Sequence, residues 1–134
     1  MEDISLHILD IVENSIAAKA KNVKIKMFKK KDELMVKIED DGVGMSKEEV
    51  KKCLDPFFTT KGKKVGLGLP LLFQSCKESE GDLKISSEEG KGTKIYAKFK
   101  LSHIDCKPLG KIDETLKVLR AGNPDVNFIY EGNI

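Results

Sequence analysis

The chain has 134 residues, 40% hydrophobic and 34% charged, a composition typical of one soluble globular domain. No apolar run approaches the roughly 20 residues that span a bilayer, and the acidic N-terminus is unlike a signal peptide, so we expect a cytoplasmic protein without membrane association. The formal charge of +2 excludes a global field that would recruit nucleic acid, and three widely spaced cysteines indicate neither a disulfide framework nor a zinc site.

The first predicted element is an amphipathic helix over residues 4–19, with Asp3 as its N-cap. Its face toward the core is formed by residues at helical spacing, namely Ile4, Ile8, Ile11, Val12 and Ser15. His7, Asp10 and Asn14 are spaced so that they form one polar stripe at the border of that face. We expect these three side chains to lie along the same surface.

Two segments of alternating apolar residues, 23–27 and 34–38, predict a β-hairpin with one face in the core. The stretch 41–44 is a turn signal because it holds two glycines after an aspartate. Ser46 and Glu49 then form a capping box, which predicts a short helix to about residue 54.

After a Gly- and Lys-rich loop, residues 67–77 predict a second apolar helix that starts through Gly66 and Gly68. Alternation around residues 83–85 and 95–99 predicts a second hairpin.

The C-terminal part predicts a helix over residues 112–121 and alternation over 126–130. The order of elements predicts an α+β fold, a two-layer sandwich with helices packed on one face of a mixed β-sheet.

Two glycine-rich turns and one carboxylate lie at the ends of predicted elements, where a backbone can approach a ligand closely. Gly42 and Gly44 follow Asp40, and Gly66 and Gly68 lead the second apolar helix. Taken singly, the first pair fits a tight turn and the second a helix start. Neither matches a P-loop or a dinucleotide fingerprint.

The joint order of these motifs resembles that of the GHKL ATPase superfamily, which includes sensor histidine kinases, anti-sigma serine kinases, mismatch-repair and gyrase ATPases and a heat-shock chaperone. The matching motifs are a helix with Asn14, D-x-G-x-G at Asp40 to Gly44, Asp55 to Phe58, G-x-G-L at Gly66 to Leu69, and Gly92-Thr93. The resemblance covers about residues 4–101 and implies the Bergerat ATP-binding fold. It divides the chain into an ATP-binding domain, 1–101, and an extension, 102–134, that packs on it or docks a partner.

The resemblance implies that Asn14 is the ligand of Mg²⁺, which prefers oxygen ligands and keeps several waters. It implies that Asp40 accepts a hydrogen bond from the adenine amino group, which a carboxylate can do because it only accepts. Gly42 and Gly44 would then let the backbone lie against the base.

The same resemblance places phosphates at the start of the second apolar helix, where free N–H groups and the helix dipole favour anions. The four residues that would supply those amides are Gly66, Leu67, Gly68 and Leu69. Lys61, Lys63 and Lys64 fall in the family's ATP lid, and one of them is expected to meet the γ-phosphate. Thr93 resembles the hydroxyl that contacts the adenine region through water.

Asp10 stands where hydrolytic relatives carry a glutamate that acts as general base on the attacking water. Its shorter side chain leaves both a catalytic and a non-catalytic role open. Glu13 faces away on the helix, and His7 is expected to be a packing or rim residue.

Three functions fit an Mg-ATP site in this chain. The first is a stand-alone kinase module that phosphorylates a partner protein in trans, since no H-E-x-x-x-P phosphoacceptor motif occurs. The second is a slow ATPase with ATP-gated partner binding, and the third is a non-catalytic ATP sensor. The partner and the oligomeric state stay open, with a homodimer as one alternative.

Overall fold

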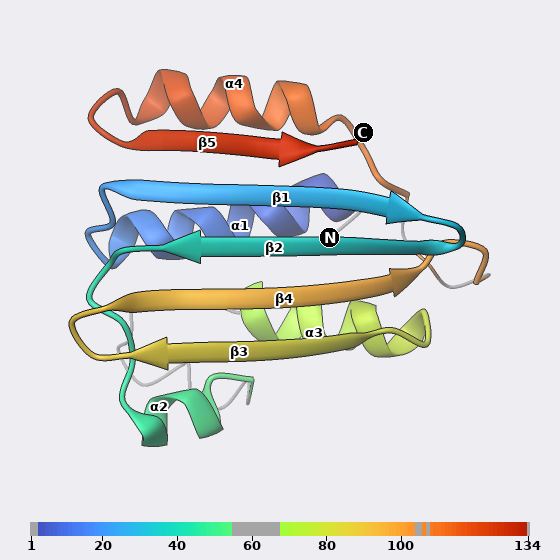
Figure 1. Cartoon of the computed structure of the whole chain (residues 1–134), viewed down its shortest axis with the longest axis horizontal. Helices are drawn as coiled ribbons and strands as arrows, with labels where there is room; N and C mark the ends of the chain where they lie inside the picture. The colour runs from blue at the N-terminus through green and yellow to red at the C-terminus, as the bar shows by residue number, and fades with distance from the viewer. Residues whose placement is uncertain (1–2, 55–67, 104–105, 107, 134) are drawn as a thin grey trace.

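The structure is a computed structural model that describes all residues except 1–2, 55–67, 104–105, 107 and 134 (Figure 1). In chain order its elements are α1 (Ile4–Ala17), β1 (Asn22–Lys30), β2 (Glu33–Asp40), α2 (Lys47–Lys52), α3 (Gly68–Glu78), β3 (Asp82–Glu88), β4 (Gly92–Lys100), α4 (Ile112–Gly122) and β5 (Asn127–Gly132). Each predicted helix and strand is present within a few residues of its expected bounds.

The five strands form one mixed sheet in the order β3-β4-β2-β1-β5. The hairpins β1–β2 and β3–β4 are antiparallel, as is the pairing of β2 with β4, whereas β5 runs parallel to β1. The β2–β4 pairing places Asp40 directly opposite Thr93. Residues from two distant motifs therefore meet at one end of the sheet.

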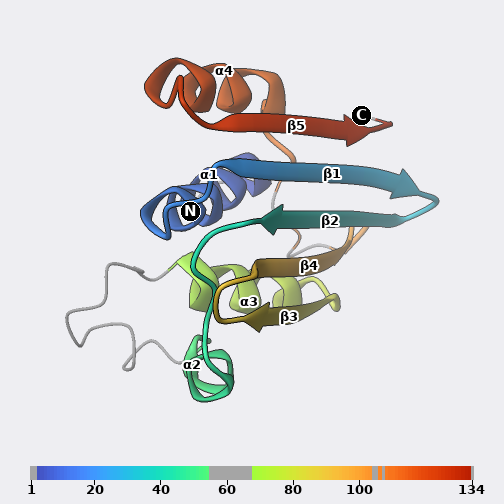
Figure 2. The same cartoon turned by 60° about the vertical axis from the view of Figure 1, so that its left-hand side comes forward.

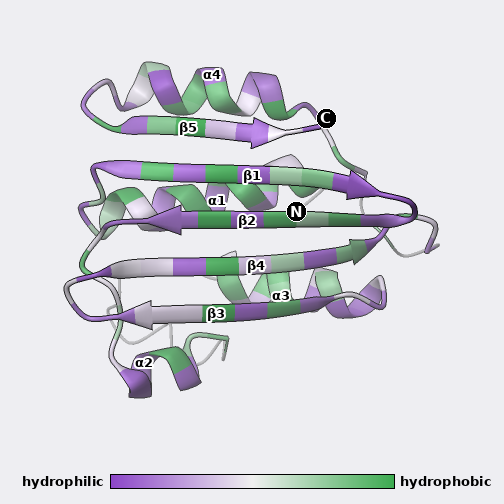
Figure 3. Ribbon diagram, in the orientation of Figure 1, coloured by the Kyte–Doolittle hydropathy of each residue, from purple (hydrophilic) through white to green (hydrophobic). Residues whose placement is uncertain are grey.

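One face of the sheet is buried, because alternate residues of each strand are apolar. Figure 3 shows this alternation of hydrophilic and hydrophobic residues along the strands. The buried faces of α1, α3 and α4 join the same core cluster as these strand residues, and Figure 2 shows the helices gathered on one side of the sheet. The predicted two-layer α+β architecture is confirmed.

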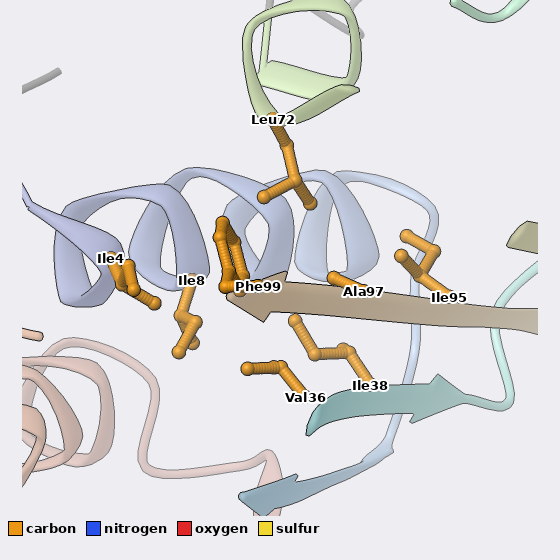
Figure 4. Close-up of a pocket in the computed structure, with 8 residues that line it drawn as sticks. All are labelled: Ile4, Ile8, Val36, Ile38, Leu72, Ile95, Ala97 and Phe99. Carbon is orange, nitrogen blue, oxygen red and sulfur yellow. The ribbon is translucent and has the colours of Figure 1, made fainter. Parts of the chain in front are cut away.

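Inside the core lies a cavity of about 10 Å³ lined by apolar side chains of both layers. Figure 4 shows Ile4 and Ile8 of α1 and Leu72 of α3 facing Phe99 on β4 across it. A space of this size and polarity holds no nucleotide and binds water poorly. This cavity is therefore not the ligand site.

The C-terminal segment completes both layers. β5 extends the sheet at β1, and α4 buries Leu116 and Leu119 in the common core next to Phe128 of β5. The division of the chain at residue 101 stays a prediction. Within the described part of the chain, no helix is long and apolar enough to cross a membrane.

Candidate functional site

One half of the candidate site lies where α1 meets the first residue of α3. A Cβ atom added to Gly68 would stand 2.8 Å from Oδ2 of Asp10 and 3.6 Å from Nδ2 of Asn14. Both α1 side chains are half-buried, and their spacing of four residues puts them on one side of the helix. The structure thus brings together three of the residues that the sequence singles out.

The side-chain amide of Asn14 has an unused hydrogen-bond donor. Its Nδ2 atom is buried and has no hydrogen-bond partner among the described residues. A buried amide without a partner costs free energy unless a ligand satisfies it. An uncommitted amide at this position can turn its oxygen toward a cation, so Asn14 fits the role of a magnesium ligand.

His7 is more deeply buried than Asp10 and Asn14. Only 2% of it is exposed, and it lies in the buried face of α1. Seven residues separate His7 from Asn14, so the two point in nearly the same direction around the helix, and the stripe of three residues stays a prediction. The expected role of His7 in packing is confirmed, and Glu13 is exposed as expected.

The start of α3 contributes backbone N–H groups to this half of the candidate site. The first N–H groups of a helix have no partner within the helix, so they are available to an anion. Gly68 and Leu69 at this start are both buried, and the side chain of Leu69 belongs to the core. Lys61, Lys63, Lys64, Gly66 and Leu67 lie outside the described residues, as do Asp55 to Phe58.

The second half of the candidate site is built around Asp40 at the end of β2. Oδ2 of Asp40 accepts the hydroxyl of Ser15 at 2.6 Å, and Oδ1 accepts the N–H of Gly42 at 2.9 Å. Each oxygen keeps acceptor capacity beyond these bonds. Ser15 follows Asn14 on α1, so this helix connects the two halves: Asn14 lies by α3 and Ser15 by Asp40.

The sequence predicts Ser15 only as a small member of the apolar face. It is 3% exposed, as that expectation requires, yet its hydroxyl holds the carboxylate of Asp40. The signal that could have found this contact is a serine directly after the proposed magnesium ligand, because a hydroxyl on an otherwise apolar face needs a partner.

The glycines after Asp40 let the turn lie close to neighbouring backbone. A Cβ on Gly42 would stand 2.7 Å from the carbonyl oxygen of Ala18, and one on Gly44, which has a φ of +73°, would collide with the carbonyl of Glu88. Val43 between them donates its N–H to Ala18 at 2.9 Å. These glycines therefore have a packing role in the structure, and their contact with a base stays a prediction.

Thr93 stands next to Asp40 and is held by a serine on β3. The hydroxyls of Thr93 and Ser87 lie 2.8 Å apart, and Ser87 also receives the N–H of Met45 at 2.8 Å. Asp40, Met45, Ser87 and Thr93 all line an open depression between the end of the sheet and α2. Hydrogen-bonding groups therefore line this depression.

Cys53 and Cys76 are buried in the core. Burial raises the pKa of Cys53 to about 11 and that of Cys76 to about 12. Such thiols stay neutral and inert near neutral pH. Among the described residues no group of three or more His, Cys, Asp or Glu side chains is placed to hold a metal ion.

A family model described as histidine kinase-, DNA gyrase B- and HSP90-like ATPase matches residues 2–103. The chain belongs to this family. The match contains both halves of the site, from Asp10 to Thr93. Recognition of the GHKL superfamily from the motifs is thereby confirmed.

Individual relatives agree with this assignment. Sporulation kinase C of Bacillus subtilis is 40% identical over 87 residues, which are 63% of this chain and 20% of that protein. The signal transduction histidine-protein kinase AtoS of Escherichia coli is 34% identical over 93 residues, 69% of this chain and 15% of that protein. The chain therefore spans about a fifth or less of the length of these relatives.

Among solved structures, the Aquifex aeolicus MutL ATPase domain complexed with ADP matches with a TM-score of 0.60. The match covers 98% of this chain and 60% of that domain, at 19% sequence identity. At this identity the likeness concerns the fold, and it supports the Bergerat architecture for the whole described chain, α4 and β5 included.

Proposed function

We propose that the chain binds Mg-ATP and serves as the nucleotide-binding part of a signalling kinase that phosphorylates a partner protein in trans. The observation that carries the proposal is the meeting of Asp10 and Asn14 with Gly68 at the start of α3. Helix amides, a carboxylate and an uncommitted amide converge there, and membership of an ATPase family supports a triphosphate as their ligand.

In this proposal Asn14 holds Mg²⁺ through its side-chain oxygen, and the ion supplies charge neutralisation at the phosphates. The amides of Gly68 and Leu69, with Gly66 and Leu67 before them, bind phosphate oxygens. Lys61 and Lys64 are the proposed lid cations. Because phosphoryl transfer depends mainly on positioning and charge, these groups and a docked acceptor are sufficient.

The adenine end of the nucleotide is proposed to lie at Asp40 and Thr93. Asp40 is held by two donors and can accept a further hydrogen bond from an amino group. Ser15, which contacts Asp40 directly, is the next residue in the chain after the proposed magnesium ligand. A nucleotide can therefore extend from the end of the sheet to α3 along the C-terminal half of α1.

The names of the relatives favour a kinase over the other two functions. Sporulation kinase C and AtoS are both kinases, and each is similar to this chain at 34% identity or more. In the kinase reaction the γ-phosphoryl group moves from ATP to a side chain of the partner, which leaves ADP. Cytoplasmic location and self-association of the chain stay predictions.

A slow ATPase is the second candidate because of Asp10. Its carboxylate stands against Gly68, at the end of the site where the phosphates are proposed to lie. There it could take a proton from an attacking water if the water stood within hydrogen-bond reach.

Calorimetry with Mg-ATP tests the site. We expect Asn14→Ala to lose magnesium-dependent affinity by about tenfold or more, since a buried ligand is removed. Glu13→Ala, an exposed neighbour on α1, should bind as the parent does. Unchanged affinity of Asn14→Ala would refute the assignment.

Incubation of the protein with γ-labelled ATP and cell lysate separates the three functions. A labelled partner protein identifies a kinase, and free phosphate alone identifies an ATPase. If the release of phosphate persists unchanged in Asp10→Ala, this carboxylate is not the base. Binding with neither product identifies a sensor and contradicts the kinase proposal.

A further inference from the structure

A short chain of hydrogen bonds stands behind Thr93. Oγ of Ser87 receives the N–H of Met45 at 2.8 Å, lies 2.9 Å from the carbonyl oxygen of Gly92, and lies 2.8 Å from Oγ1 of Thr93. Ser87 is directly opposite Thr93 across β3 and β4, and Thr93 is directly opposite Asp40 across β4 and β2. Three polar residues therefore form one row over three adjacent strands.

The direction of each bond in this row follows from the number of hydrogens. A carbonyl oxygen only accepts, so the contact of Ser87 with Gly92 uses the single hydroxyl hydrogen of Ser87. We assign the hydrogen of the contact between the two hydroxyls to Thr93, since that of Ser87 is given to Gly92. Ser87 thus donates one bond and accepts two, which leaves Thr93 with lone pairs alone for a ligand.

Asp40 presents the same polarity beside it. Its two oxygens accept from the hydroxyl of Ser15 and the N–H of Gly42, and a carboxylate has no hydrogen of its own to offer. The floor of the depression at the end of β2 and β4 therefore consists of two neighbouring acceptors.

We propose that Ser87 is a positioning residue for nucleotide specificity, because it takes the hydroxyl hydrogen of Thr93 and so makes Thr93 an acceptor only. The inference rests on the proposed binding of ATP. Adenine carries an amino group at position 6, whose N–H bonds suit such a floor. Hypoxanthine and guanine carry a carbonyl oxygen there, which would face lone pairs and remain unpaired.

The polarity is the same if a water stands between Thr93 and the base. A water that gives one hydrogen to Thr93 has its second hydrogen for the ring nitrogen N1. This nitrogen accepts in adenine and carries a hydrogen in hypoxanthine. Ser87 thus selects adenine either directly through Thr93 or through the water that Thr93 orients.

The test compares the dissociation constants of ATP and inosine triphosphate, which differ at position 6 and N1. The parent should prefer ATP. In Ser87→Ala the hydroxyl of Thr93 can rotate and donate, so we expect the preference to fall by about tenfold, the worth of one hydrogen bond. Ser86→Ala, which removes the neighbouring hydroxyl on β3, should keep the parent's preference.

A purely structural role of Ser87 would give a different result. Loss of the bond to Met45 alone would weaken the binding of both nucleotides by the same factor. The ratio of the two dissociation constants would then stay unchanged, which would overturn the inference. If Ser87→Ala does not fold, Thr93→Val provides the second test, because it keeps the shape and removes the acceptor. It should weaken ATP more than inosine triphosphate, and an unchanged ratio overturns the inference.

Failure of the proposed function has a separate signature. A parent that binds neither nucleotide contradicts ATP binding and the role of Ser87 together. A parent that binds ATP and keeps its preference in both variants contradicts only the role of Ser87.

Discussion

The substitution Gly68→Ala places one methyl group between α1 and the start of α3. The added Cβ would stand 2.8 Å from Oδ2 of Asp10 and 3.2 Å from its Cγ, so the carboxylate must turn away. Because it is the end of a flexible side chain, and alanine favours a helix by up to about 1 kcal/mol over glycine, the free energy of unfolding should change by less than about 1 kcal/mol. Affinity for Mg-ATP should fall by about tenfold or more, which corresponds to about 1.4 kcal/mol.

Calorimetry with Mg-ATP and thermal unfolding of the same preparations measure the two effects. Gly122→Ala at the end of α4 is the matched control, since its added Cβ would meet nothing within 4 Å beyond its chain neighbours and the backbone of its own helix. The control should keep the parent's affinity and its stability within about 1 kcal/mol. If Gly68→Ala binds Mg-ATP as tightly as the parent, the placement of the phosphates between α1 and α3 is refuted.

Three further predictions concern stability and reactivity. Gly44→Ala and Gly90→Ala both force alanine to a positive φ, of 73° and 81°, but only at Gly44 would the Cβ strike a backbone carbonyl. Denaturant unfolding should show a cost of about 1–2 kcal/mol for Gly90→Ala and a larger one for Gly44→Ala, and equal costs would contradict the close approach. Burial raises the pKa of Cys76 to about 12, so alkylation at pH 8 should reach the half-buried Cys106 first. Equal alkylation rates for Cys76 and Cys106 would argue against the burial of Cys76. The neutral buried thiol of Cys76 contributes fully to the free energy of unfolding below the unfolded pKa of about 8.5, and this contribution is lost as pH rises toward about 12. Hydrogen bonds from the side chain and the backbone of Asn22 lower the pKa of Asp41. The carboxylate therefore contributes to the free energy of unfolding above its usual pKa, and this contribution is lost as pH falls through the lower folded pKa. In Asp41→Asn the free energy of unfolding should therefore fall less steeply with decreasing pH than in the parent. Equal slopes in the two proteins would contradict this prediction.

The features that the sequence predicts correctly depend on residues close together in the chain. Alternation indicates the strands, and the capping box at Ser46 and Glu49 forms as its spacing predicts. Asp10 and Asn14 share a surface because helix geometry alone puts residues four apart side by side. The nucleotide roles of the site residues remain predictions.

The features that the sequence does not predict depend on register between distant elements. The turn of the second hairpin brings Thr93 opposite Ser87, but nothing near either residue indicates that β2 will set Asp40 beyond Thr93. Ser15 belongs to the apolar face as predicted, but its hydrogen-bond partner lies in another element. His7 is also more buried than the sequence indicates, because the residues that pack against a helix are not visible in the helix itself.

The parallel pairing of β1 with β5 has a consequence for synthesis on the ribosome. Asn22 and Asn127, which face each other in this pairing, are 105 residues apart, whereas β1 and β2 are joined by a tight turn. At roughly 5–20 residues per second, one edge of β1 stays uncovered for roughly 5–20 s after that strand emerges. An open edge can recruit a strand from another chain, so a nascent protein of this topology benefits from chaperone cover until its last strand arrives.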